Sequence, residues 1–381
     1  MARRWLDQEH EIFREAFRRY VQKEIAPHIA EWDQQGQVPR EAWLALGRQG
    51  YLCPWLEERY GGSGADFGYS VIIIEEIARA GALSFMVGLH SDIVTPYLHA
   101  FANEEQRQRW LPGAASGQSI LAIAMTEPDA GSDLQAMRAT ASKDGEHYLL
   151  NGSKTFISNG QCCDLVIVAA KTDLQADPAR GGISLLVVEE GAPGFVKGNK
   201  LKKMGLHGQD TCEMVFSDCR VPAANLLGRE GRGFAYMMEK LQQERLVCAV
   251  MSQAAAEAML RWTVDYCQER RIFGRPVGQF QHNAFKLAEM ATEVELGRAF
   301  LDELIEDHMA GRDIVSKVSM AKWWISEMAN RVAYHGVQLH GGYGYMEEYP
   351  ICRAYRDVRV HTIFAGTTEV MKSIIAKRMG L

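Results

Sequence analysis

The spacing of hydrophobic residues changes twice along the chain and divides it into three parts. In the first part, apolar side chains recur every three or four residues, which is typical of helices with one buried face. The clearest stripe consists of Ile12, Phe13, Phe17, Tyr20, Val21 and Ile25. We therefore predict a helical domain over residues 1–118.

The middle part has a period of two, which is typical of strands with one buried face. Large apolar side chains occupy every second position from residue 121 to residue 125, and a further apolar run lies at residues 165–168. The dipeptides Asp144-Gly145 and Asn151-Gly152 predict tight turns between strands. Residues 119–228 are therefore predicted to form a β domain, either a sandwich or a small barrel.

Helical spacing returns in the third part. Long segments with this spacing cover residues 234–271, 283–310 and 314–339. Long helices that are joined by short glycine-containing breaks are typical of antiparallel bundles. We predict a four-helix bundle over residues 229–381, and an α+β fold class for the whole chain.

Composition and charge exclude several kinds of protein. A length of 381 residues exceeds what one hydrophobic core usually serves, which agrees with more than one domain. The net charge of −6 argues against nucleic acid as a partner, because phosphate backbones select basic surfaces. No apolar run approaches the roughly 20 residues that span a bilayer, so no membrane span is expected.

The cysteines indicate a reducing compartment and no metal site. All eight lack the C-x-x-C spacing of redox and zinc motifs. The start of the chain, Met1-Ala2-Arg3-Arg4-Trp5, has no apolar segment behind it, so no secretory signal peptide is expected. We expect either the bacterial cytoplasm or, for a mature processed chain, a matrix-like compartment.

One loop has the composition of a phosphate or flavin site. Residues 124–133 have the sequence AMTEPDAGSD, in which a strand runs into a turn of small residues. Such a turn presents hydroxyls and backbone N–H groups without bulky side chains, which suits a pyrophosphate or a flavin ring edge. The alternative is an ordinary surface loop between strands. The chain has no strand-G-x-G-x-x-G-helix unit, which argues against a dinucleotide bound in the Rossmann manner.

A charged pair lies beside an apolar stripe on the first long helix of the third part. At 100° per residue, Met238, Leu241, Arg245 and Cys248 share one stripe, and Glu244 lies at its edge. A carboxylate in such a place is often simply ion-paired at the flank of a helix. A buried carboxylate can also serve as a general base.

Five stretches, in this order, resemble the acyl-CoA dehydrogenase family, and the match is closest to its long-chain branch. They are AMTEPDAGSD at 124–133, NGSKTFISNG at 151–160, RRIFG at 270–274, VQLHGGYGY at 337–345 and HTIFAGTTE at 361–369. The resemblance implies a helical, β and helical domain order and bound FAD. It also implies α,β-dehydrogenation of medium-chain, long-chain or methyl-branched acyl-CoA to trans-2-enoyl-CoA. Electron-transferring flavoprotein is the implied electron acceptor, and the implied assembly is a homotetramer.

The resemblance also implies where the catalytic base lies. Many members carry a glutamate immediately before the Gly-Thr pair, where this chain has Ala365. The segment LQQERL at residues 241–246 resembles the Glu-Arg segment that carries the base in the long-chain and isovaleryl branches. Because flavin chemistry at an acyl α carbon requires a base, Glu244 is the predicted catalytic residue.

The remaining site residues follow from the same resemblance. Phe156 is expected to stack on the flavin ring where many members carry tryptophan, and Arg270 is expected to reach the flavin of a neighbouring subunit. The loop differs from the family pattern at Asp129, where glycine is usual, and we expect this carboxylate to point to solvent. The implied FAD contacts are Met125, Thr126, Gly131, Ser132, Phe156, Ile157, Ser158, Arg270, Phe273, Gln281, Gln338, Gly341, Gly342, Thr367 and Glu369. The implied acyl-CoA contacts are Ser132, Gln242, Arg245, Phe364, Ala365 and Gly366.

Two other functions remain open from the sequence. An acyl-CoA oxidase would pass electrons from the flavin to oxygen, although such enzymes usually have an extra C-terminal helical domain. A non-catalytic acyl-CoA-binding or scaffold protein would need no base, and an intact Glu244 argues against it.

Overall fold

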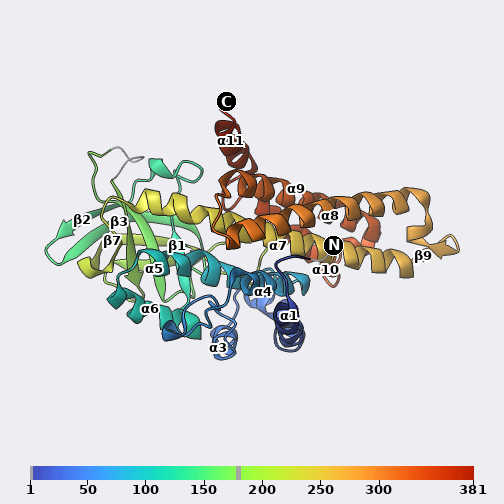
Figure 1. The fold of residues 1–381 in the computed structure, drawn as a ribbon, viewed down its shortest axis with the longest axis horizontal. Helices are drawn as coiled ribbons and strands as arrows, with labels where there is room; N and C mark the ends of the chain where they lie inside the picture. Colours follow the sequence, from blue (N-terminus) through green and yellow to red (C-terminus); the bar gives the residue numbers. More distant parts are fainter. Residues whose placement is uncertain (1–2, 177–181) are drawn as a thin grey trace.

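The structure is a computed structural model that describes residues 3–176 and 182–381 (Figure 1). A helical part, a β part and a second helical part follow one another along the chain, which confirms the predicted order and the α+β class. The domain boundaries at residues 118 and 228 stay predictions.

The N-terminal part is built from short helices around the buried helix α4. Helix α1 begins at a capping box, in which Asp7 Oδ1 accepts a hydrogen bond from the His10 amide at 3.0 Å. Helix α4 is buried over almost its whole length. The helices are α1 (Gln8–Tyr20), α2 (Ile29–Gln35), α3 (Arg40–Arg48), α4 (Phe67–Arg79), α5 (Thr95–Phe101) and α6 (Glu104–Ser116), with π-helical turns η1 (Val21–Ile25) and η4 (Leu89–Val94).

The predicted stripe on the first helix is wrong at Ile12. Its side chain is 61% exposed, whereas Phe17, Val21 and Ile25 are buried as predicted. The face that α1 turns inward carries two polar residues, His10 and Arg14, which are buried because they pair with carboxylates of the neighbouring segment. A count of apolar residues alone could not reveal a buried face that is partly charged.

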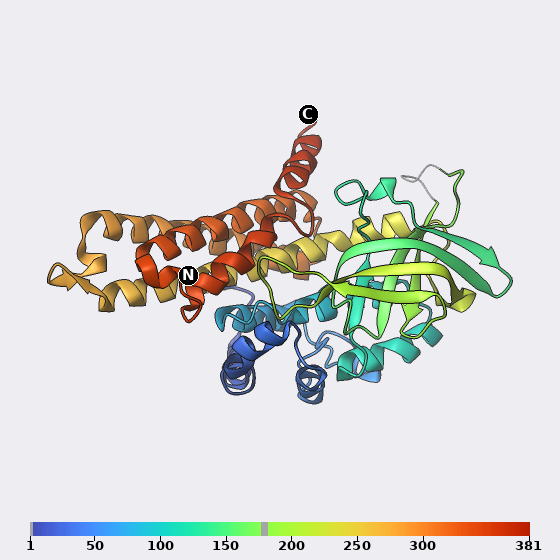
Figure 2. The same ribbon diagram turned by 180° about the vertical axis from the view of Figure 1, so that it is seen from behind.

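The β part is a single sheet that encloses its own core. The strand order is β6-β7-β3-β2-β4-β5-β8, and β1 pairs in parallel with β4. The two halves of the sheet join through one residue pair, Thr140 with Lys171, and side chains from both halves share one apolar cluster. Figure 2 shows the sheet seen from behind. The strands are β1 (Leu121–Ala124), β2 (Thr140–Asp144), β3 (His147–Ser158), β4 (Leu165–Lys171), β5 (Ile183–Glu189), β6 (Phe195–Lys200), β7 (Thr211–Pro222) and β8 (Leu226–Leu227).

One of the two predicted turns is confirmed and the other is wrong. Asp144-Gly145 lies at the β2–β3 hairpin, where Gly145 has a φ of 58°. Asn151-Gly152 lies inside β3, at a bulge against β7. A Cβ at Gly152 would approach Ala139 to 2.8 Å, so the glycine is required for close backbone contact rather than for a turn.

The C-terminal part is an antiparallel bundle. Helix α7 is about 55 Å long, since each residue adds about 1.5 Å, and it links the β part to the far end of the bundle (Figure 1). The short strands β9 (Arg271–Ile272) and β10 (Arg275–Pro276) turn the chain back there. The helices are α7 (Gly233–Glu269), α8 (Gln281–Met309), α9 (Val315–His340), α10 (Pro350–Val358) and α11 (Thr368–Arg378). Among the described residues, no helix is both long and apolar enough to cross a membrane.

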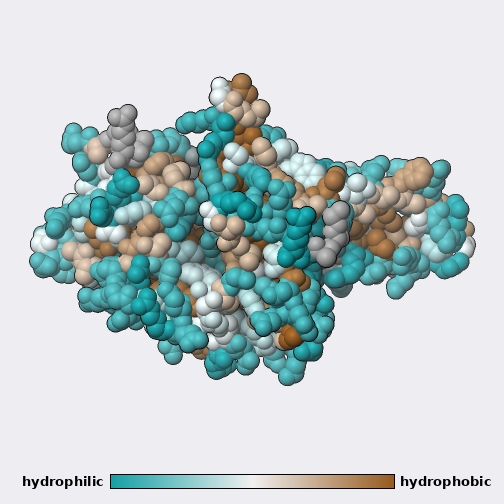
Figure 3. Space-filling model, in the orientation of Figure 1, coloured by the Kyte–Doolittle hydropathy of each residue, from teal (hydrophilic) through white to brown (hydrophobic). Residues whose placement is uncertain are grey.

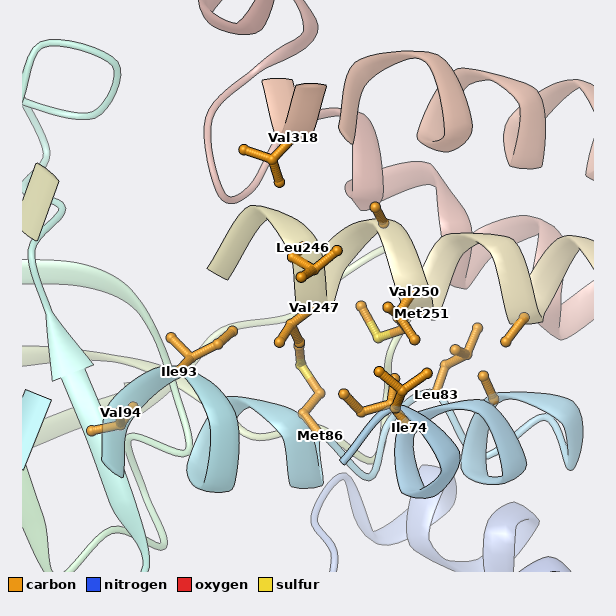
Figure 4. Close-up of a cluster of buried hydrophobic side chains, with 14 of the residues drawn as sticks. Ile74, Leu83, Met86, Ile93, Val94, Leu246, Val247, Val250, Met251 and Val318 are labelled. Atoms are coloured by element: carbon orange, nitrogen blue, oxygen red, sulfur yellow. The ribbon is translucent and has the colours of Figure 1, made fainter. Parts of the chain in front are cut away.

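A continuous core joins the first part to the bundle and fixes the position of α7. Figure 4 shows Ile74 of α4 and Ile93 of η4 packed on the side of α7 that carries Val247. A buried ion cluster supports the same contact, because Glu75 Oε2 lies 2.7 Å from Arg3 Nη1 and Glu75 Oε1 lies 2.8 Å from Arg298 Nη1. The half of α7 that carries Glu244 is therefore held between two layers of helices.

Candidate active site

Glu244 lies on α7 in surroundings that favour its neutral form. Its Oε2 atom is enclosed and has no hydrogen-bond partner in the described part of the chain. Burial raises the pKa of this carboxyl to about 7, and the charges of Arg245 and Lys322 offset part of the rise. The side chain can therefore exchange a proton near neutral pH.

Three of the four predicted stripe residues around this carboxyl are buried, namely Leu241, Arg245 and Cys248. The fourth, Met238, is half-buried. Two of the predicted substrate contacts also carry enclosed atoms that lack partners within residues 3–176 and 182–381, namely Gln242 Oε1 and Arg245 Nε. Unpaired polar atoms are costly inside a protein, so their grouping on one turn of α7 is typical of a binding or reaction site.

The segment at residues 364–366 follows His361, which contacts α7 one and two turns after Glu244. One turn after Glu244 on the same face, Cys248 Sγ contacts the carbonyl oxygen of His361 at 3.7 Å. His361 Nδ1 lies 3.0 Å from Ser252 Oγ, and the His361 ring stacks on Phe364 with centroids 5.3 Å apart. The structure thus brings the predicted base and the predicted substrate segment together.

Lys322 of α9 lies beside the place where α7 and the 364–366 segment approach each other. The side chain is fully buried, and its Nζ donates to the Gly366 carbonyl oxygen at 2.5 Å. Ala365 has a φ of 54°, which is uncommon for a residue with a Cβ, so the backbone here is held in a strained form. Lys322 was not predicted from the sequence, although a lysine within the helical segment 314–339 was an available signal.

Helix α11 begins directly after this segment. Thr367 caps it, because its Oγ1 accepts a hydrogen bond from the Val370 amide at 3.2 Å. Glu369 lies exposed in the first turn, where backbone amides and Thr367 lower its pKa. The Thr367 hydroxyl is thus engaged twice, because its oxygen accepts from the cap amide and its hydrogen is donated to the Glu369 carboxylate.

One group of the predicted FAD contacts gathers at the edge of the β part. Strand β1 ends at Ala124, and the Thr155 amide donates to the Thr126 carbonyl oxygen at 2.9 Å. Phe156 is 67% exposed, as a stacking platform requires. Thr126 and Ser158 are half-buried, and Gly131 and Ser132 are exposed.

Two predicted FAD contacts of this group can contribute backbone atoms but not side chains. The side chains of Met125 and Ile157 are buried in hydrophobic clusters, so only their backbone atoms can face a ligand. Asp129 is exposed as predicted, and its Oδ2 lies 3.0 Å from Arg138 Nη1.

The second group of predicted FAD contacts lies at the far end of the bundle. Arg270 ends α7, and its guanidinium lies 5.3 Å from the ring centroid of Tyr343. Along α7, Arg270 is about 40 Å from Glu244, because 26 residues separate them. One protomer therefore does not bring the two groups together. The others in this group are Phe273, Gln281, Gln338, Gly341 and Gly342, and all of them are exposed.

Comparison with known proteins identifies the family. The acyl-CoA dehydrogenase N-terminal, middle and C-terminal domain families match residues 7–118, 122–219 and 231–380. The chain belongs to the acyl-CoA dehydrogenase family. The pig (Sus scrofa) long-chain specific acyl-CoA dehydrogenase, mitochondrial, is 48% identical over 99% of this chain and 88% of its own length. A Bacillus subtilis acyl-CoA dehydrogenase is 40% identical over 97% of both chains.

Solved structures agree with this assignment. The crystal structure of an acyl-CoA dehydrogenase from Geobacillus kaustophilus has a TM-score of 0.98 and 57% sequence identity, and the match covers 100% of both chains. The butyryl-CoA dehydrogenase of Megasphaera elsdenii has a TM-score of 0.93 and 34% identity over 99% of both chains. The protein is therefore an FAD-dependent acyl-CoA dehydrogenase, which confirms the predicted reaction class and cofactor.

The residues present at the edge of the β part fit FAD. Thr126 and Ser158 offer hydroxyl groups beside the exposed face of Phe156, so hydrogen bonding and stacking are available together. A Cβ at Gly131 would meet only Thr126 Cγ2, at 3.9 Å, so the loop leaves open space there. Across residues 3–176 and 182–381, no cluster of His, Cys, Asp and Glu is arranged to hold a metal ion.

Proposed function

We propose that this acyl-CoA dehydrogenase uses Glu244 as the base that removes an α proton from medium-chain, long-chain or methyl-branched acyl-CoA. The observation that carries the proposal is the Glu244 carboxyl on α7, whose enclosed Oε2 has no hydrogen-bond partner among the described residues. It lies near the segment in which Ala365 occupies the other position that the family resemblance suggests for a base. FAD, when bound, supplies the acceptor for the hydride that leaves the β carbon. The chain supplies the base and the groups that stabilise charge.

The 364–366 segment has a second role in this proposal. Removal of the α proton places negative charge on the thioester oxygen, which needs donors that are already in position. The Gly366 amide and the N-terminal end of α11 can supply them, and Lys322 fixes this backbone through the Gly366 carbonyl. Gln242 and Arg245 complete the proposed acyl-CoA contacts, together with Ser132 and Phe364.

The rate of flavin reduction by acyl-CoA is expected to rise with pH through a midpoint near 7. Only the carboxylate form of Glu244 accepts a proton, and its pKa is raised to about 7, so the active fraction grows as pH rises through that value. The charged groups that face it are Arg245 and Lys322, whereas the Tyr97 hydroxyl, whose pKa is raised by burial, is neutral throughout this range. Anaerobic stopped-flow absorbance from about pH 5.5 to about pH 8.5 measures the profile. A rate that stays flat across this range, at saturating substrate, would contradict the assignment.

The substrate class and the acceptor are tested together. We propose electron-transferring flavoprotein as the acceptor, as the family resemblance of the sequence implies. Anaerobic bleaching of the flavin by short, medium, long and methyl-branched acyl-CoAs ranks the substrates, and no bleaching by any of them would favour a non-catalytic role. Reoxidation of the reduced enzyme by oxygen faster than by electron-transferring flavoprotein would favour an oxidase.

We also propose a homotetramer in which the far end of each bundle completes the FAD site of a neighbour. Arg270, Gln281 and residues 338–342 are too distant from the Thr126 loop to share its ligand within one protomer. Their end of the bundle also exposes apolar side chains, with Phe273 at 91% and Phe285 at 60% exposure. Figure 3 shows apolar residues among hydrophilic ones on this half of the bundle. Such a surface is suited to burial against another copy.

Substitution of Arg270 by alanine is expected to weaken FAD binding about tenfold or more. Loss of one charge-assisted contact typically costs about 1.5–3 kcal/mol. The measurement is the dissociation constant of FAD from reconstituted apoprotein, with mass determined by light scattering. Arg275→Ala is the matched control, because Arg275 lies in the same hairpin with its guanidinium 4.0 Å from the Phe280 ring centroid. Unchanged FAD affinity in an intact oligomer would make Arg270 a simple helix-end charge.

The cysteines support a reducing compartment. All eight are free thiols, and six of them are buried. We propose the bacterial cytoplasm or a matrix-like compartment as the location.

A further inference from the structure

A buried ion pair lies directly behind the proposed FAD contacts of the β part. Lys154 of β3 is fully buried, and its Nζ lies 2.8 Å from Glu127 Oε1. Burial alone raises the pKa of Glu127, but Lys154 and two backbone amides lower it more strongly, so the group is a carboxylate at neutral pH. Neither residue has a role in the proposed chemistry.

The Glu127 carboxylate closes the loop that carries Gly131 and Ser132. Its Oε2 accepts a hydrogen bond from the Arg138 amide at 2.6 Å, and its Oε1 accepts one from the Ala139 amide at 3.0 Å. The Glu127 backbone also exchanges hydrogen bonds with Ala130, at 2.9 and 3.2 Å. One carboxylate therefore ties the beginning of the loop to its end.

Lys154 connects this loop to the strand that presents Phe156. Its Nζ donates to the Met125 carbonyl at 3.2 Å as well as to Glu127. The pairing of β3 with β7 shifts register between Lys154 and Ile157, so Lys154 is the last regular residue before a bulge. In the bulge, the Thr155 amide donates to the Thr126 carbonyl instead of to β7. The bulge turns Phe156 outward, with a φ of 60°.

We propose that Glu127 and Lys154 are a positioning pair that holds the Thr126 loop and the Phe156 bulge in register for FAD. The proposal rests on the proposed FAD contacts at Thr126, Phe156 and Ser158. Two segments that are far apart in the sequence must present hydroxyls and a ring face to one rigid ligand, and small displacements of such groups are costly. A buried ion pair with further hydrogen bonds on both partners supplies a fixed geometry at that point.

The alternative is an ion pair that stabilises the β domain without affecting FAD. Removal of one partner leaves a buried charge without compensation, so some loss of stability is expected in either case. A variant with the same kind of loss elsewhere in the domain separates the two roles. Lys197 of β6 is the comparison, because its Nζ donates to the carbonyl oxygens of Gln161 and Cys163 and to Glu190 at 3.1, 2.6 and 2.7 Å. Its removal also takes a bonded ammonium group out of the domain, although the Glu190 side chain is 57% exposed and keeps its contact with water.

The test compares FAD dissociation constants of reconstituted apoproteins in the absence of any substrate. We expect Lys154→Met to raise the constant about tenfold or more, because the contacts to FAD lose their common support. Lys197→Met is expected to lower the melting temperature of the apoprotein without a comparable change in FAD affinity. If Lys154→Met does not fold, Glu127→Gln replaces it, since the amide keeps one acceptor oxygen and removes the charge.

A double-mutant cycle with Thr126→Val locates the effect. If Lys154 acts through the Thr126 loop, the changes in FAD affinity for Lys154→Met and Thr126→Val will not add in the double variant. Additive effects, or a folded Lys154→Met or Glu127→Gln protein with native FAD affinity, would overturn the positioning role. Native affinity in Thr126→Val alone would instead reject the proposed Thr126 contact. The base assignment at Glu244 is independent of both outcomes, because no substrate is present.

Discussion

Substitution of Glu244 by glutamine will abolish most of the flavin reduction by acyl-CoA while FAD stays bound. A general base typically contributes about a hundredfold to ten-thousandfold, and we expect a loss of at least this size. Glutamine keeps the shape of the side chain and cannot accept the proton. Glu244 Oε2 has no hydrogen-bond partner among the described residues, so the substitution breaks no hydrogen bond of that atom there. Stability is therefore expected to change little.

The measurement is the rate of flavin bleaching in an anaerobic single turnover at saturating acyl-CoA. Glu239→Gln is the matched control, because it removes the same charge from the same helix at an exposed position, where Glu239 Oε1 lies 3.1 Å from Lys240 Nζ. The control is expected to react at the native rate. A Glu244→Gln enzyme that bleaches within a few-fold of native would assign the base to another residue.

The hydrophobic pattern predicts the helices of this protein better than its strands. For α7, the predicted range of 234–271 compares with Gly233–Glu269, because a long helix repeats its spacing many times. The strand prediction is wrong at Asn151-Gly152, since the same dipeptide suits a turn and a bulge, and only the approach of Ala139 decides between them. The parallel pairing of β1 with β4 joins segments 44 residues apart, from Leu121 to Leu165, and no local pattern encodes it.

Sequence patterns are equally limited in predicting the functional site. The motifs contain Thr126, Phe156 and Glu244, which can be recognised from the residues next to them in the sequence. Glu127 and Lys154 lie within two of these motifs, yet their function depends on each other across 27 residues. Lys322 depends in the same way on the Gly366 carbonyl, 44 residues away. Buried polar residues become interpretable only when the partner that satisfies them is known.

Addition of Ala365→Glu to Glu244→Gln is expected to restore part of the lost flavin reduction. The family resemblance of the sequence implies that the base can also stand at the position of Ala365. Here both positions adjoin one another through the contact of Cys248 with His361 and the electrostatic pairing of Lys322 with Glu244. The strained φ of 54° already holds a residue with a Cβ, so a longer side chain adds no new backbone cost. A carboxylate placed there can therefore reach the same α carbon.

Recovery will be partial, because a displacement of about 1 Å can cost on the order of a hundredfold in rate. The preference for acyl chain length is also expected to change, since the new side chain enters from the opposite wall and alters the space for substrate. Glu244→Gln with Ala365→Gln is the matched control, as it has the same bulk without a carboxylate, and it should stay as slow as Glu244→Gln alone. Suppose the double variant with glutamate binds FAD and acyl-CoA normally but reduces flavin no faster than this control. Glu244 and Ala365 would then not share one catalytic space, and the proposed convergence of α7 with the 364–366 segment on the substrate would be wrong.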